Sequence, residues 1–247
     1  ENEFKTSKQI LNQIKYNIKF MDNNIKSLCQ NLYLNNKIQS IMYNKEKDPE
    51  LAEIIMSMNN ISSTVLSTHP SVHSIYVYNN YNKTFYSTYK GLLYQDDCLN
   101  EVIASFDIVP KLVPILRKIE ANDGRKNEYD DVFTYFLYGS IDANNMMDGA
   151  VIVNVKAKWL MDNVSALNAL NNNDEEKVYI VSEKGEFITN KSIEKDDFDK
   201  LFIEHYSTSM NKSNLSKEQM GIYNDIIDGK NYTITYVYVD DAKLLLL

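Results

Sequence analysis

Apolar residues recur every three or four positions through the first 44 residues of the chain. The series runs through Leu11, Ile14, Ile18, Met21, Ile25, Leu28 and Leu32. Lysine, asparagine, glutamine and aspartate fill the positions between them, and no proline or glycine interrupts the pattern. This seven-residue repeat predicts one long helix, which would measure about 60 Å. The helix could pack along the body of its own chain or serve as a stalk that dimerises, and the two are compatible.

A second helical pattern and a series of alternating stretches follow. Residues 51–66 are amphipathic, begin after Asp48-Pro49-Glu50 and must end before Pro70. Runs of β-branched and aromatic residues predict strands at Val72–Tyr78, Thr84–Tyr89, Val132–Tyr138 and Gly149–Val155. Shorter amphipathic stretches predict helices at Asp96–Phe106, Lys111–Glu120 and Lys156–Leu170.

The same order of elements recurs in shortened form after a polar linker at 171–174. The predicted elements are strands at Lys177–Ser182, Glu186–Thr189, Met220–Ile227 and Tyr232–Val239 and a helix at Asp196–Tyr206. Asp228-Gly229 is a favoured two-residue turn and should join the last two strands as a hairpin. Ala242–Leu247 is either a last strand or the start of an exit segment. The fold class is therefore α+β, divided into a helix at 1–45 and subdomains at 46–170 and 171–247.

The composition is that of a folded protein, with 44% hydrophobic and 24% charged residues. The 34 acidic and 26 basic residues give a net charge of −8 and form no blocks, which argues against a nucleic-acid-binding face. Cys29 and Cys98 are expected to be unpaired thiols. No apolar run approaches the roughly 18 residues that span a membrane. Because the first residue is Glu1, we expect an excised or processed piece, from which a signal peptide or membrane helix could have been removed.

Motifs that would indicate an enzyme are missing from the sequence. There is no Gly-rich phosphate loop, no nucleophile elbow and no Cys-x-x-Cys pair. His69 and His73 are four residues apart, but a proline and a predicted strand break the helical spacing that would place both on one metal. Paired acids such as Asp96-Asp97 are better explained as helix starts than as catalytic dyads. The sequence therefore predicts no catalysis, no metal and no cofactor.

Five segments, taken in order, resemble the double-Cache extracellular sensor domains of bacterial membrane receptors. The segments are Ser74–Thr88, Pro114–Ile119, Asp131–Gly139, Gly149–Leu160 and Val178–Thr189. They look most like receptors of low-GC Gram-positive bacteria whose cytoplasmic part is an AraC-type DNA-binding domain or a histidine kinase. The resemblance implies a long N-terminal stalk helix followed by two PAS-like antiparallel-sheet subdomains in tandem.

The resemblance also implies a cellular setting and partners. It places this domain outside the cell, with the full-length protein anchored in the cell membrane on both sides of the fragment. It implies a small-molecule ligand in the membrane-distal half, 46–170, and a homodimer through the N-terminal helix. No nucleic acid would be bound through this domain. Ligand would close residues 92–130 over itself and bias the stalk helix and the C-terminal strand between two positions.

Two polar residues are the first candidates for ligand contact. Arg117 lies in the predicted helical insert, and its planar guanidinium matches a carboxylate bidentately, which suggests a carboxylate-bearing ligand. It could instead form an ion pair with Glu120 at helical spacing. Asn154 interrupts the apolar run GAVIVNV, and ligand anchoring or loop capping would satisfy it. The resemblance places Asn154 where amino-acid-binding members have an aspartate, whereas their Arg-x-Trp-Tyr cluster is absent here.

Three strand tyrosines complete the predicted site: Tyr76, Tyr78 and Tyr135. Alternation places Tyr76 and Tyr78 on one face of their strand, where each could line a pocket or simply pack. The predicted function is small-molecule sensing. Two alternatives are a surface module that binds a protein through the stalk helix or sheet, and a solute-binding protein that acts through a partner receptor. A cavity with Arg117 or Asn154 pointing inward would favour the sensor.

Overall fold

The structure, a computed structural model, describes most of the chain. The described residues are 2–46, 51–121, 128–143, 145–162, 178–182, 185–188, 197–209, 220–240 and 244–247. The chain divides into two compact units, which we name the first unit (Asn23–Ala157) and the second unit (Glu1–Asp22 with Lys158–Leu247). Each unit has a five-stranded sheet and a hydrophobic core of its own.

The observed elements follow the predicted order with a few exceptions. The helices are α1 (Asn2–Tyr33), α2 (Asn36–Tyr43), α3 (Leu51–Ile61), the π-helical segment η1 (Ser62–Leu66), α4 (Asp97–Ala104) and α6 (Asp197–Ser209), with 157–162 also helical. The strands of the first unit are β1 (Val72–Asn79), β2 (Thr84–Ser87), β3 (Ile115–Glu120), β4 (Tyr129–Tyr138) and β5 (Gly149–Lys156). Those of the second unit are β6 (Ile180–Ser182), β7 (Phe187–Ile188), β8 (Met220–Ile227), β9 (Lys230–Val239) and β10 (Leu244–Leu246).

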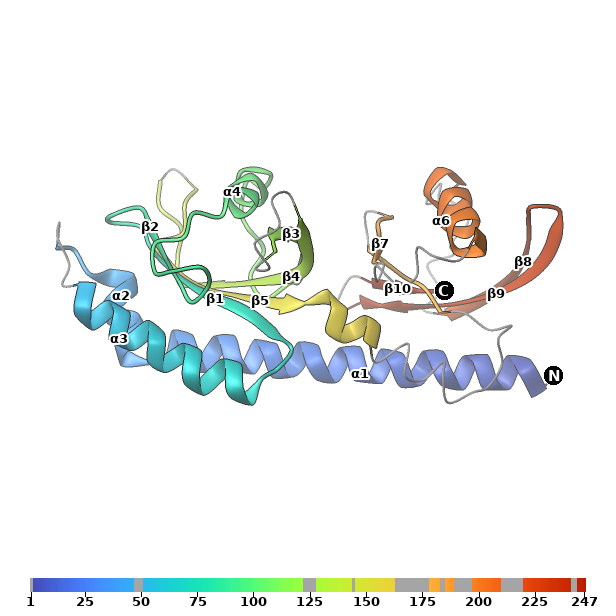
Figure 1. Cartoon of the computed structure of the whole chain (residues 1–247), viewed down its shortest axis with the longest axis horizontal. Coiled ribbons are helices and arrows are strands. Elements are labelled where there is room, and N and C mark those ends of the chain that lie inside the picture. Colours follow the sequence, from blue (N-terminus) through green and yellow to red (C-terminus); the bar gives the residue numbers. More distant parts are fainter. Residues whose placement is uncertain are drawn as a thin grey trace. The chain divides into compact units, whose positions relative to one another are not determined.

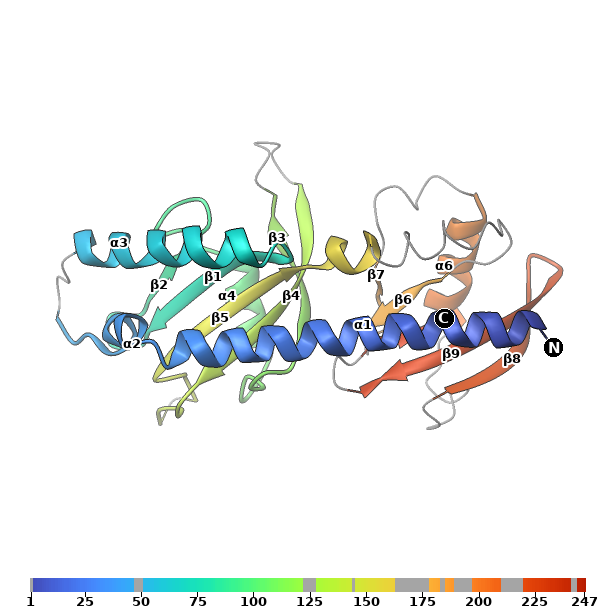
Figure 2. The same cartoon turned by 90° about the horizontal axis from the view of Figure 1, so that it is seen from below.

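The first unit is built on an antiparallel sheet with strand order β2-β1-β5-β4-β3. Val153 pairs with Ile75 on one side and Tyr135 on the other, so these three side chains share one face. Figures 1 and 2 show α1, α2 and α3 along one face of this sheet and α4 on the other. Asn79, whose parity matches Ile75, donates from Nδ2 to the carbonyl oxygen of Ile41 at 2.7 Å and so ties α2 to the helix-covered face.

The opposite face carries the core beneath α4. Its buried members include Tyr76, Tyr78, Leu99, Ile119, Val132, Phe136, Tyr138 and Ile152. Three polar residues have the same parity on neighbouring strands: Arg117 on β3, Thr134 on β4 and Asn154 on β5. Polar side chains on this otherwise apolar face must find partners within it, because buried polar groups without hydrogen bonds are costly.

The single helix predicted over the first 44 residues is wrong near its end. α1 ends at Tyr33, and Asn35 takes an extended conformation that begins α2, with its Oδ1 accepting from the backbone N–H of Lys37 at 2.9 Å. Asparagine competes well for such capping positions, and the heptad spacing hides the break. All seven apolar residues of the heptad series are at most 7% exposed, so they pack along their own chain. No helix in the described ranges is both long and apolar enough to cross a membrane.

The helix predicted at Lys111–Glu120 is also wrong, because its second half is the edge strand β3. Pro114 breaks the segment, and the six residues that follow pair antiparallel with β4, with Arg117 opposite Val132. The four-residue spacing of Ile115 and Ile119 fits a helix, but it also fits two inward positions of a strand. Pairing with β4 decides between the two, and it places Arg117 on a sheet.

The sheet of the second unit has the order β7-β6-β10-β9-β8, with β10 in the centre. The predicted hairpin is confirmed: Asp228 and Gly229 have φ of 48° and 74°, as a type I′ turn between β8 and β9 requires. An aromatic core that includes Tyr179, Phe202 and Tyr206 packs α6 onto one face. Of the two interpretations of the last residues, the structure shows a strand. The predicted linker at 171–174 lies outside the described residues.

Candidate functional site

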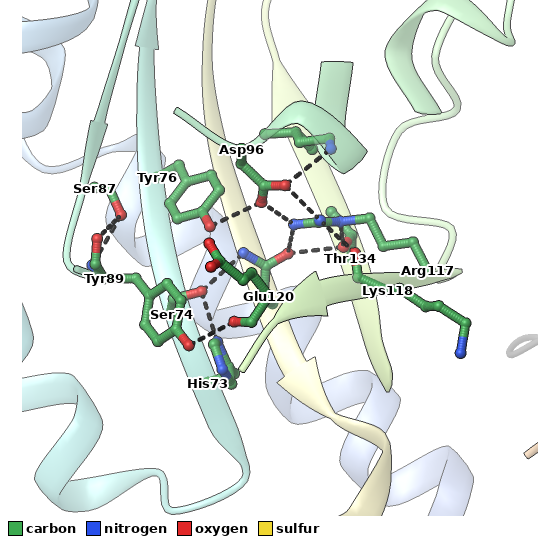
Figure 3. A network of polar contacts seen from close by, with 12 residues as sticks. His73, Ser74, Tyr76, Ser87, Tyr89, Asp96, Arg117, Lys118, Glu120 and Thr134 are labelled. Atoms are coloured by element: carbon green, nitrogen blue, oxygen red, sulfur yellow. Dashed lines mark hydrogen bonds and ion pairs between the residues drawn. The ribbon is translucent and has the colours of Figure 1, made fainter. Parts of the chain in front are cut away.

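A connected group of polar side chains lies on the α4 face of the first sheet (Figure 3). At its centre Arg117 is only 6% exposed. Its Nη2 lies 2.9 Å from Asp96 Oδ2 and its Nη1 donates to Asp96 Oδ1 at 3.2 Å, a bidentate ion pair. Nε donates to Thr134 Oγ1 at 2.7 Å and Nη2 to Asn154 Oδ1 at 2.9 Å. Nη1 also donates to the carbonyl oxygen of Lys118 at 3.1 Å, so every nitrogen of the guanidinium donates at least one hydrogen bond.

Asp96 comes from the other side of the site, at the start of α4. Its Oδ1 accepts from the backbone N–H of Leu99 at 3.0 Å and caps the helix, while Oδ2 accepts from the hydroxyl of Tyr76 at 2.9 Å. Burial, and then the negative charge of Asp96, raises the pKa of Tyr76 above its usual range. The phenol therefore stays protonated and donates to the carboxylate.

The network continues through the central strands towards β1. The Thr134 hydroxyl donates to Asn154 Oδ1 at 2.7 Å, and Asn154 Nδ2 donates to Ser74 Oγ at 2.9 Å. Ser74 Oγ lies 3.0 Å from His73 Nδ1. Thr134, Asn154 and Ser74 are each fully buried, so these bonds satisfy groups that water does not reach. The site is therefore a pre-organised polar strip across four strands.

The segment between β2 and α4 is tied to the far end of β3 beside the site. The hydroxyl of Tyr89 donates to the carbonyl oxygen of Glu120 at 2.7 Å, and that of Tyr94 donates to Glu120 Oε2 at 3.2 Å. Lys90 Nζ lies 3.1 Å from the same carboxylate oxygen. Glu120 thus pairs with this segment. The alternative that Arg117 forms a structural ion pair is confirmed, but its partner is Asp96 and not Glu120.

The structure brings three of the five predicted site residues together. Arg117 and Asn154 are in direct contact, and Tyr76 joins them through its bond to the Asp96 carboxylate. Tyr78 shares their face but donates to Asn80, at 3.0 Å. The alternation on β4 puts Tyr135 on the opposite, helix-covered face of the sheet, so the structure does not bring it to this group.

Sequence reasoning missed Asp96, Thr134, Ser74 and His73. Thr134 interrupts an apolar alternation on β4 as Asn154 interrupts β5, and the same argument could have found it. The sequence favours Asp96 as a helix start, which is correct, but an N-cap gives no sign of a second partner 21 residues away. Cys29 and Cys98 are not joined by a disulfide, as predicted. Within the described ranges no three His, Cys, Asp or Glu side chains gather as a metal site would require.

His73 predicts an acid dependence of stability. Burial, and then the positive charges of Lys156 and Arg117, lowers its pKa from 6.5 to about 4. The unfolded chain therefore takes up this proton at a higher pH than the folded one, so stability is full above pH 6.5 and falls as the pH drops towards 4. We expect a loss of about 1–2 kcal/mol, allowing for the partial exposure of the ring. Urea unfolding at pH 7 and pH 4.5 should show a smaller loss in His73→Gln than in His69→Gln; equal losses would contradict the assignment.

Solved structures with this fold are sensory domains. A domain of a sensory box/GGDEF family protein from Vibrio parahaemolyticus aligns with 100% of this chain and 94% of its own, with a TM-score of 0.60 and 13% identity. The extracellular domain of the histidine kinase vpHK1S-Z8 covers 100% and 92%, with a TM-score of 0.60 and 13% identity. The ligand-binding domain of the Campylobacter jejuni chemoreceptor Tlp3, in complex with L-valine, covers 100% and 91%, with a TM-score of 0.54 and 11% identity. No family model and no curated protein matches the chain.

The class of fold follows from the topology and these alignments together. The chain has an N-terminal helix followed by two antiparallel five-stranded sheets, which is the tandem PAS-like arrangement of sensor domains. The predicted double-Cache fold is confirmed.

Proposed function

We propose that this chain is the extracellular sensor domain of a membrane-anchored bacterial receptor and that it binds a small carboxylate-bearing molecule at Arg117. The observation that carries the proposal is a guanidinium held almost fully buried on the α4 face of a sensor-type sheet. Solved structures of the same fold are sensory domains, and the Tlp3 domain holds L-valine, itself a carboxylate.

The choice of arginine at this position supports the proposal. Only two of the 26 basic residues in the chain are arginine, and one of them is placed in the core. A buried cation is costly to hold, and a planar fork is suited to binding carboxylates with two parallel hydrogen bonds. A group of this kind, fixed by Thr134 and Asn154 from neighbouring strands, is pre-organised to recognise such a ligand.

The proposal also covers the location of the ligand, the output domain and the oligomeric state. We place the ligand in the subdomain 46–170, treat 171–247 as the membrane-proximal subdomain, and assign the output to an AraC-type DNA-binding domain or a histidine kinase in the full-length protein. A homodimer through α1 is supported by Tyr16 and Phe20, which are four residues apart and 66% and 58% exposed. No catalysis, metal or cofactor is part of the proposal. Ligand acts only through its different affinities for two states.

The test is ligand-induced stabilisation of the fragment. A panel of amino acids and mono- and dicarboxylates is compared with purines, sugars and amines by thermal unfolding, and hits are confirmed by calorimetry. A carboxylate at about 100 times its dissociation constant should add about 2.7 kcal/mol, or roughly 5–10 °C. Thr134→Val removes one partner of Arg117 and should weaken binding, whereas Thr233→Val on β9 should not. Stabilisation by uncharged or cationic compounds alone would contradict the proposal.

A further inference from the structure

Every polar side-chain atom of the Arg117–Asp96 pair already contacts another polar group of the protein. Arg117 donates four hydrogen bonds, one of them to Asp96, and its Nη2 also lies 2.9 Å from Asp96 Oδ2. Oδ1 of Asp96 accepts from Arg117 and from the backbone of Leu99, and Oδ2 accepts from Tyr76 and lies 2.9 Å from Arg117 Nη2. Since a carboxylate oxygen accepts about two bonds, the pair is saturated. A ligand that binds either residue must first displace the other.

The two residues differ in how firmly they are held. Arg117 belongs to a strand paired along its length with β4, and its side chain is bonded to two central strands through Thr134 and Asn154. Asp96 precedes an eight-residue helix and follows residues 88–95, which belong to no helix or strand. Arg117 is therefore fixed through a paired strand, whereas Asp96 is held through a loop that Tyr89 and Tyr94 tie to Glu120. The incoming group must then suit the guanidinium.

We propose that Asp96 is an internal carboxylate that occupies the ligand's place on Arg117, so that a ligand carboxylate binds by exchange and releases α4. This inference rests on the proposed function in one respect, namely that Arg117 receives the ligand. The exchange replaces one bidentate pair by another of the same geometry, and no bond order or charge changes at Arg117. The helix loses its Asp96 cap when the carboxylate leaves.

Two consequences follow from such an exchange. First, only the small fraction of molecules in which Asp96 is away from Arg117 can bind the ligand. The apparent affinity is therefore the intrinsic affinity multiplied by that fraction. Second, ligand binding is obligatorily coupled to displacement of the start of α4, because both carboxylates cannot occupy the same fork. The Asp96 carboxylate thus links occupancy of Arg117 by ligand to a movement of the chain, which is what a sensor requires.

The test removes the Asp96 carboxylate by mutation and supplies a carboxylate in solution as acetate. Asp96→Gly deletes a side chain whose atoms correspond to acetate, and glycine is well tolerated as an N-cap. Its unfolding midpoint should fall by about 6–20 °C, because the Arg117 charge is left buried without its partner. Sodium acetate, raised to about ten times its dissociation constant, should restore about 3–6 °C in a saturable manner. Sodium chloride of equal ionic strength and neutral acetamide should not.

The controls separate a site from general stabilisation. Wild type and Asp97→Asn, altered at the exposed neighbouring residue, should gain less than about 1 °C from the same acetate. If Asp96→Gly does not fold, Asp96→Ala, which also leaves the place of the carboxylate empty, is measured in the same way. Absence of an acetate-specific gain in the folded variant overturns the proposal.

A second arm distinguishes failure of this inference from failure of the proposed function. Any carboxylate that binds wild type in the panel should bind Asp96→Gly at least about tenfold more tightly, because it no longer competes with an internal group. Weaker binding to the variant would show that Asp96 contacts the ligand directly, and would overturn the inference while the sensor function stands. If no panel compound binds wild type but acetate stabilises the variant, the exchange at Arg117 is supported and the proposed function alone fails.

Discussion

Leu246→Asp is expected to unfold the second unit. Leu246 is the last residue of β10 and pairs with Ile180 on β6 and with Val237 on β9. All three are fully buried on the face opposite the aromatic core. A carboxylate there would have to be buried without a partner or expelled by separating the central strand from both neighbours. Either route costs more than about 4 kcal/mol, which is a large part of the stability of a domain.

The matched control is Ile226→Asp, on the edge strand β8, where the side chain is 62% exposed and a charge meets water. We expect a change within about 0.5 kcal/mol for that variant. Trp159, the only tryptophan, belongs to the second unit, so its fluorescence reports unfolding of that unit. Hydrogen exchange in β4 and β5 reports the first unit. A Leu246→Asp protein with unchanged tryptophan emission and an unchanged unfolding midpoint would show that β10 does not hold the sheet together.

Arg117→Ala is expected to destabilise the first unit by about 3–5 kcal/mol, the cost of removing one partner from a buried ion pair. Asp96 would keep Tyr76 and its own helix cap but would lose its counter-charge in a site that water does not reach. Thr134 and Asn154 would each lose a donor. The thermal midpoint should fall by roughly 6–20 °C.

The neighbouring residue provides the control for this loss. Lys118→Ala removes a cation whose side chain is 68% exposed and whose partner, Asp131, lies 3.4 Å away, so its effect should stay below about 1 kcal/mol. A double variant, Asp96→Leu with Arg117→Met, removes both charges and should be more stable than Arg117→Ala. If the double variant were the least stable, the polar strip rather than the buried charge would account for the loss.

The fold was largely predictable because most strands can be recognised from their local sequence pattern. Alternating β-branched and aromatic residues located β1, β4 and β5, and Asp228-Gly229 located the β8–β9 hairpin. The prediction failed where local pattern is ambiguous. Ile115 and Ile119 suit a helix or a strand equally, and only pairing with β4 decides. The break at Asn35 is hidden because an asparagine fits both a helix surface and a cap.

The candidate site was predictable only in part, because its geometry depends on contacts between distant residues. Arg117 and Asn154 stood out as polar residues in apolar stretches, and register brings them together. Nothing local shows that Asp96 reaches across from α4 to the same guanidinium. Whether Tyr135 faces the helices or the site depends on which residue of β4 opposes Val153, and alternation alone does not fix that choice.

The central position of β10 restricts how a mechanical signal can pass through the second sheet. A strand with one bonded neighbour can be peeled away bond by bond, whereas β10 is bonded on both sides and resists a pull along its axis in shear. A force applied at the end of β10 is therefore shared by all five strands. The sheet should tilt or rotate as a rigid body, and β10 should not slide along its axis relative to its neighbours.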